Sequence, residues 1–171
     1  MSTDSTPGGD LVDRIVEEWA GERPDLDLAT LATGARLLRI SELLAVELTR
    51  RLERLELSAG WFEVLAALRR RGEPFQLTPT ELLKSVLRTS GAMTSRLDGM
   101  ERAGLIRRLQ HPGDRRSVLV ELTPRGRTLA DRAITIHPAN DARLLAALTP
   151  DERDQLSALL AKLLRSLEPQ A

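Results

Sequence analysis

Residues 104–126 read GLIRRLQHPGDRRSVLVELTPRG, and this stretch decides the fold. Two short runs of alternating apolar and polar side chains, 105–110 and 117–122, flank the turn sequence His-Pro-Gly-Asp at 111–114. Alternating runs on both sides of Pro and Gly predict a β-hairpin. The turn leaves Arg115 and Arg116 at the tip, so we expect an exposed cationic ribbon.

The segment before this hairpin has the pattern of a helix that enters a DNA groove. Residues 89–102, TSGAMTSRLDGMER, place Met93, Leu97 and Met100 on one apolar face at helical spacing. The other face carries hydroxyl and charged groups, which contact base edges and phosphates in protein–DNA complexes. The predicted DNA-binding residues are Thr89, Ser90, Gly91, Thr94, Ser95, Asp98, Arg102, Arg115 and Arg116.

Two roles are open for Asp98. Its carboxylate can accept from a cytosine amine, or it can hold Arg102 one helical turn later. Arg115 and Arg116 suit a minor groove, where narrow A·T tracts concentrate negative potential. A helix followed by a cationic ribbon is the arrangement of a winged helix-turn-helix, so the predicted fold class is mainly α with a small β wing.

Helix start signals surround this motif. Thr78-Pro-Thr-Glu81 and Thr149-Pro-Asp-Glu152 are capping boxes with Pro at the first helical position, and Thr123-Pro124 is a similar start. We expect a long helix at about 28–55, and a helix after Thr123 that runs through Ile136 with a kink or break at Pro138.

The outer helices carry leucine stripes that a small middle domain cannot cover. We therefore expect a homodimer. The predicted organisation is a disordered tail (1–9), N-terminal dimerisation helices (10–57), a winged helix-turn-helix lobe (58–123) and C-terminal dimerisation helices (124–168), which together form one continuous structural unit.

Composition narrows the function classes. The 171 residues include no Cys, which excludes disulfides and thiolate chemistry. The net charge is zero, but residues 72–128 carry 10 basic and 6 acidic side chains, whereas residues 1–57 carry 7 and 12. Positive charge therefore collects on the segment predicted to meet DNA. Phosphate loops, metal-ligand spacings and nucleophile elbows are missing, so we expect no enzyme, no cofactor and no metal. Without a signal peptide or membrane span, we expect a cytoplasmic protein.

The hairpin also carries a family resemblance. Asp114-Arg-Arg-Ser-Val-Leu-Val-Glu-Leu-Thr123 matches the wing signature Asp-x-Arg-x-x-x-Val-x-Leu-Thr of MarR-type transcriptional regulators, and residues 90–97 with 104–106 resemble their recognition helix and strand entry. The resemblance implies a dimeric, ligand-responsive repressor that binds double-stranded DNA at a pseudopalindromic operator. It assigns Asp114 to wing organisation through a neighbouring Arg. Gly99 departs from the family pattern, in which many members carry Arg.

A first helix with Trp19 resembles the branch of this family that responds to urate. The resemblance implies a small planar anionic effector, such as urate or a phenolic compound, bound by Trp19, Glu63, Arg96 and Arg108. Glu63 stands where that branch has Asp. The residues also allow plainer roles: a core Trp19, a solvated Glu63, and an Arg96 paired with an acidic side chain or phosphate.

One alternative function comes from a different class. The leucine stripes also suit a helical interaction module that binds another protein and never contacts DNA.

Overall fold

The computed structural model describes residues 8–86 and 93–168, except for the side chains of residues 111, 114–116 and 137–140. The chain forms two compact units, Met1–Glu47 and Leu48–Ala171, which meet within one long helix. The four-part division expected from the sequence stays a prediction.

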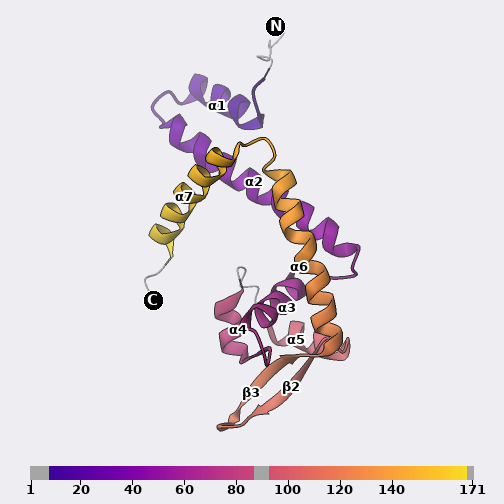
Figure 1. Ribbon diagram of the computed structural model, residues 1–171. Helices are drawn as coiled ribbons and strands as arrows, with labels where there is room; N and C mark the ends of the chain where they lie inside the picture. Colours follow the sequence, from indigo (N-terminus) through magenta and orange to yellow (C-terminus); the bar gives the residue numbers. More distant parts are fainter. Residues whose placement is uncertain (1–7, 87–92, 169–171) are drawn as a thin grey trace. The chain divides into compact units, whose positions relative to one another are not determined.

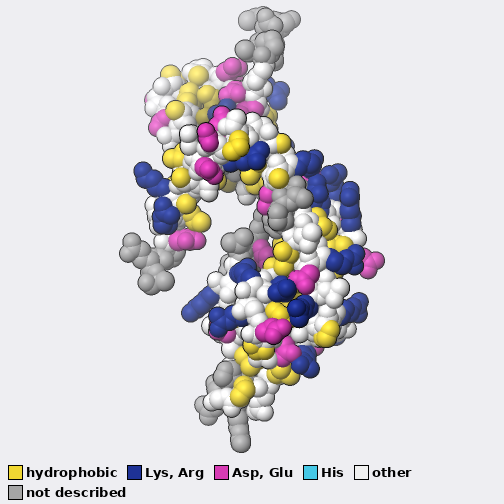
Figure 2. Space-filling model, in the orientation of Figure 1, with side chains coloured by type: hydrophobic (Ala, Val, Ile, Leu, Met, Phe, Trp, Pro, Cys, Tyr) yellow, Lys and Arg dark blue, Asp and Glu magenta, His cyan; other side chains and the backbone are white. Residues whose placement is uncertain are grey.

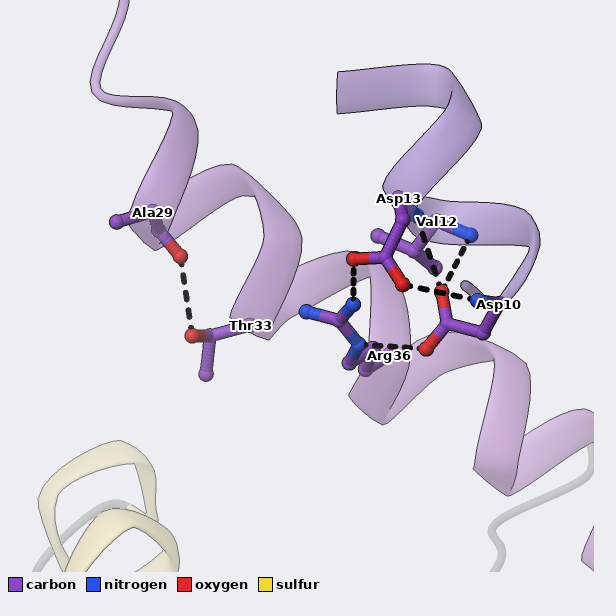
Figure 3. A network of polar contacts seen from close by, with 6 residues as sticks. All are labelled: Asp10, Val12, Asp13, Ala29, Thr33 and Arg36. Carbon is purple, nitrogen blue, oxygen red and sulfur yellow. Dashed lines mark hydrogen bonds and ion pairs between the residues drawn. The ribbon is translucent and has the colours of Figure 1, made fainter. Parts of the chain in front are cut away.

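The first unit contains α1 (Leu11–Glu22) and most of α2 (Leu28–Glu53). Asp10 caps α1 by accepting from the backbone N–H groups of Val12 and Asp13, and the Asp13 carboxylate accepts from the Asp10 N–H in return. Arg36 of α2 donates to the Asp10 carboxylate at 2.8 Å and also to Asp13 (Figure 3). The α1 cap is thus tied to the middle of α2 by one guanidinium group.

The second unit contains the predicted winged helix-turn-helix. Its helices are α3 (Ala59–Arg71), α4 (Pro79–Ser85), α5 (Met93–Arg102), α6 (Pro124–Leu144) and α7 (Pro150–Leu167), and its strands are β1 (Gln76–Leu77), β2 (Ile106–His111) and β3 (Asp114–Leu122). The hairpin of β2 and β3 extends away from α3, α4 and α5 (Figure 1). The fold class predicted from the sequence is confirmed.

The three predicted helix starts are also confirmed. Thr78, Thr123 and Thr149 each cap a helix through the side-chain oxygen, with Pro in the first helical turn. Such caps satisfy backbone N–H groups that have no partner within the helix. The helix boundaries are therefore encoded locally.

One core holds the second unit together. It joins the end of α2 to α3, the three-stranded sheet, α5 and the start of α6. Its largest fully buried side chains are Leu52, Val64, Leu65, Leu68, Leu82, Leu97, Met100, Ile106 and Val120. Burial of this apolar surface fixes the face of α5 that points inward.

The sheet has the order β1-β3-β2 and is antiparallel throughout. In it, Gln76 pairs with Glu121, and Arg108 pairs with Val120. The hairpin of β2 and β3 was predicted, but the two-residue strand β1 was not. Two residues are too few to show an alternating pattern of apolar and polar side chains, so β1 is recognised only from its pairing with β3.

The expectation for Pro138 was partly wrong. We expected a kink or break in the helix near Pro138, but α6 continues as one helix to Leu144, so it does not end there. A proline inside a helix removes one backbone hydrogen bond, but the hydrogen bonds of the neighbouring turns can still hold a long helix together.

Candidate nucleic-acid interface

Helix α5 presents the predicted polar face to solvent. Met93, Leu97 and Met100 are buried, with exposed fractions of 8%, 2% and 0%. The opposite side of the helix carries four exposed residues that were predicted to meet DNA: Thr94, Ser95, Asp98 and Arg102. Because the core residues fix the rotation of the helix about its axis, these side chains are held outward together.

Several predicted contact residues cannot be placed in the same way. Thr89, Ser90 and Gly91 lie outside the described residues. The backbones of Asp114, Arg115 and Arg116 begin β3 just after the turn, where Asp114 pairs with His111. Their side chains lie outside the described part of the chain, so their roles at DNA stay predictions.

Arg108 joins the start of the wing to α5. Its guanidinium donates to the Asp98 carboxylate at 2.6 Å and to the Glu101 carboxylate at 2.5 Å, while its backbone N–H donates to Glu101 at 3.0 Å. Burial works to lower the pKa of Arg108, but the hydrogen bonds to Asp98 and then Glu101 outweigh it and raise that pKa above its usual value. Arg108 therefore stays charged, and its single positive charge is shared by two carboxylates beside the exposed face of α5.

These contacts answer part of the question about Asp98. Arg102 donates to the backbone carbonyl of Asp98 at 3.3 Å, so in the described contacts the carboxylate does not hold Arg102. The carboxylate is 50% exposed while its Oδ1 atom is bound by Arg108. On the face drawn in Figure 2, Asp and Glu side chains lie interspersed with Lys and Arg.

Glu63 and Arg96 meet between α3 and α5. An oxygen of Glu63 lies 3.9 Å from a terminal nitrogen of Arg96, and the two side chains are only 16% and 12% exposed. Glu63 is therefore not the solvated acid that its helical position indicated, because α5 covers it. Arg96 has the acidic partner that the sequence allowed.

Within the second unit, the structure pairs two of the three predicted ligand residues found there. Glu63 and Arg96 form a pair, whereas Arg108 is bound by Asp98 and Glu101 on another flank of α5. Trp19 lies in the first unit, where its side chain is 43% exposed, so it is not a core residue of that unit.

Other kinds of site find little support among the described residues. None of their helices has the length and apolar character that crossing a membrane requires. Within the same residues, no three His, Asp or Glu side chains are grouped closely enough to hold a metal ion.

Comparison with known proteins identifies the family. The chain is 37% identical over 156 residues to the HTH-type transcriptional regulator PecS of Dickeya dadantii, covering 91% of this chain and 94% of that protein. A MarR family model matches residues 57–118, which include α3, α4, α5, β2 and the start of β3. The chain belongs to the MarR family.

Solved structures of two known proteins share the fold. A cysteine-to-serine variant of MarR from E. coli, complexed with operator DNA, is 28% identical with a TM-score of 0.70, covering 91% of this chain and 99% of that one. BpsR of Bordetella bronchiseptica, whose DNA binding is regulated by 6-hydroxynicotinic acid, is 26% identical with a TM-score of 0.69, covering 80% of this chain and 94% of that one. Among these proteins, PecS carries the name of a transcriptional regulator.

Some residues that shape this MarR-type site were missed by sequence reasoning. Glu101 was not a candidate, yet it binds both the side chain and the backbone of Arg108. Gly99 was read as the loss of a possible cation, but its missing Cβ makes room for the indole of Trp61. The available signal was the glycine itself, since glycine inside a helix often marks a close approach.

Proposed function

We propose that this protein is a sequence-specific regulator of transcription that binds double-stranded DNA as a homodimer on a pseudopalindromic operator and acts as a repressor. A small planar anion is proposed to release it from DNA. The family membership supports the first part, and the name of PecS as a transcriptional regulator and the operator complex of MarR support it further.

One observation carries the DNA-binding proposal. The exposed polar face of α5 is backed by buried Met93, Leu97 and Met100, and the same unit extends a hairpin from the end of that helix. An exposed helix face beside an extended ribbon can occupy a major groove and the adjacent minor groove at once.

The apolar surface of the helices outside the lobe supports a homodimer. No residue of α7 is buried, and six of its leucines are exposed: Leu156, Leu159, Leu160, Leu163, Leu164 and Leu167. In the first unit, Leu38 is 71% exposed and Val46 is 66% exposed. Exposed apolar surface on this scale marks an interface. A second copy of the chain places two recognition helices in successive major grooves, about 10 base pairs apart.

The effector part of the proposal concerns the urate-responsive branch of the family. The nearly buried pair of Glu63 and Arg96 supports it, because a carboxylate and a guanidinium between α3 and α5 can exchange partners with an entering anion. The regulation of BpsR by an aromatic acid offers a precedent within the fold. We propose that Glu63, Arg96 and Arg108 contact the effector. Trp19, which the resemblance adds to this set, stays a prediction.

Gel-shift titration tests DNA binding. The probe is the duplex upstream of the protein's own gene, titrated at several salt concentrations with the wild type and with Arg115→Ala and Arg116→Ala variants. We expect a specific shift that weakens steeply with salt and with both substitutions, since each phosphate contact releases counterions. A protein-interaction module would give no specific shift, and that result would overturn the proposal.

Sedimentation tests the dimer. Leu163→Glu places a charge on the exposed apolar face of α7, and we expect it to convert a dimer into a monomer that no longer shifts the probe. Arg165→Glu, close by on the same helix, is the control and should remain dimeric. A wild-type protein that sediments as a monomer contradicts this part.

Calorimetric titration with urate tests the effector. Trp19→Phe, Glu63→Gln and Arg96→Gln should each weaken urate binding, whereas Arg23→Gln, an exposed residue paired only with Asp25 in the described contacts, should not. Absence of urate binding to the wild type would remove this branch assignment and leave DNA binding intact.

A further inference from the structure

The contact between α3 and α5 is built from two glycines and two large side chains. On α3, a Cβ atom added to Gly60 would lie 2.9 Å from the Cζ atom of Arg96. On α5, a Cβ atom added to Gly99 would lie 3.0 Å from Cζ2 of the Trp61 indole. Each helix therefore places one large flat side chain over the glycine of the other.

Trp61 is the large uncharged side chain in this contact. It is partly buried and packs against the core of the second unit. Glycine in the middle of a helix is unfavourable compared with alanine, because it loses more backbone freedom on folding. Gly99 lies within a helix of ten residues, and its missing Cβ leaves room for the indole, so the close approach gives a physical reason for a glycine there.

The two flanks of α5 are held in different ways. On the flank towards α3, Trp61 rests against Gly99 and Arg96 covers Gly60. On another flank, Arg108 binds Asp98 and Glu101. The salt bridges can lengthen without steric cost, whereas the space between the indole and Gly99 is too small to take an added methyl group without a shift. The indole therefore sets how far α5 can rotate towards α3.

We propose that Trp61 is a positioning residue for DNA reading, which acts through Gly99 to set the rotation of α5 and so the angle at which Thr94, Ser95, Asp98 and Arg102 meet the bases. This inference rests on the proposed function. A side chain at position 99 needs space beside the Trp61 indole, so a large one such as leucine has to displace the indole or turn the exposed face of α5. Base contacts depend on this angle, whereas phosphate contacts tolerate it.

The test enlarges the residue at position 99 and then reduces the residue at position 61. Duplexes are first selected from a random pool by the wild-type protein, and the best duplex and the unselected pool are then titrated with each variant. We expect Gly99→Leu to bind the selected duplex about tenfold more weakly, while its binding to the unselected pool, which is dominated by phosphate attraction, changes little. A merely destabilised helix would lower both affinities.

Rescue identifies the indole as the cause. Trp61→Ala combined with Gly99→Leu vacates the space that leucine needs, and we expect this double variant to recover most of the lost preference for the selected duplex. Should that pair fail to fold, Gly99→Ala and Trp61→Phe form a milder pair for the same cycle. Independent, additive effects of the two positions would overturn the proposal, since coupled residues do not add.

Gly34→Leu is the matched control. Gly34 lies within α2, and no described atom of its own chain lies within 4 Å of an added Cβ, so the same substitution there tests helix propensity without a contact inside the chain. It should leave the ratio of the two affinities unchanged. If the wild type selects no sequence at all, the proposed function fails. If the wild type selects a sequence and Gly99→Leu reads it equally well, only the role of Trp61 fails.

Discussion

Arg108 of β2 donates to the Asp98 carboxylate of α5 across 2.6 Å, so the wing and the exposed helix face are joined by a salt bridge. The same guanidinium binds Glu101. Without it, two carboxylates would stand beside a helix face that we propose approaches phosphates. The bridge thus both orients the wing and removes a repulsion.

Replacing Arg108 tests this relationship. Arg108→Gln should weaken operator binding about tenfold, because like charges near the DNA are left uncompensated. Arg107→Gln is the matched control. It removes the same charge from the neighbouring residue, which is paired with Glu121 instead. Gel shifts measure both variants, and an equal loss for the two would show that only total charge matters.

Substitution of Phe75 tests how much its packing and its cation–π contacts stabilise the lobe. The guanidinium groups of Arg69 and Arg127 lie over its ring, at 5.3 Å and 4.8 Å from the ring centroid, and Arg69 also binds Asp131 at 2.6 Å. Phe75→Ala should lower the free energy of unfolding by about 2 kcal/mol, through lost packing and two lost cation–π contacts. Phe75→Leu keeps apolar volume without the ring and should cost about half as much in urea-induced unfolding. An Ala variant as stable as the wild type contradicts this account.

Gly126 tests the junction between the wing and α6. An added Cβ atom would lie 1.9 Å from the carbonyl oxygen of Leu105, which also accepts from the Thr123 backbone at 3.1 Å. Because backbone cannot yield as a side chain does, Gly126→Ala should destabilise the fold by about 3 kcal/mol. Thermal unfolding measures the effect. Gly34→Ala, in open space within a helix, should be neutral or slightly stabilising, and equal results for the two variants would be inconsistent with the clash.

Acid should loosen the cap of α1. The hydrogen bond from Arg36, followed by that from the Asp13 backbone, lowers the pKa of Asp10 below its usual 3.8. A carboxyl whose pKa is lower in the folded state stabilises the fold above its unfolded pKa, and that stability is lost as the pH falls through the folded pKa. We expect helical circular dichroism to decline below about pH 4 in the wild type.

Asp10→Asn supplies the comparison for this titration. Asparagine still caps a helix but carries no charge for Arg36, so the variant should lack the part of the acid transition that comes from Asp10. Superimposable pH profiles for the two proteins would mean that Asp10 does not titrate against Arg36.

Much of the fold followed from local signals. The three threonine caps and the hairpin turn were readable because each depends on neighbours within a few residues. The exposed face of α5 was readable because three apolar residues recur at helical spacing. β1 and the passage of α6 beyond Pro138 were not, since pairing and propagation depend on the rest of the fold.

The candidate site divides in the same way. Amino-acid order alone determined which residues of α5 point outward, since helical periodicity and the cost of exposing Met93, Leu97 and Met100 leave one solution. Only the tertiary structure decided that Glu63 is covered, that Arg108 binds Asp98 and Glu101, and that Trp61 rests on Gly99. Those contacts join different helices and strands. Their distances depend on how the side chains of the shared core pack, and a short sequence pattern does not encode that packing.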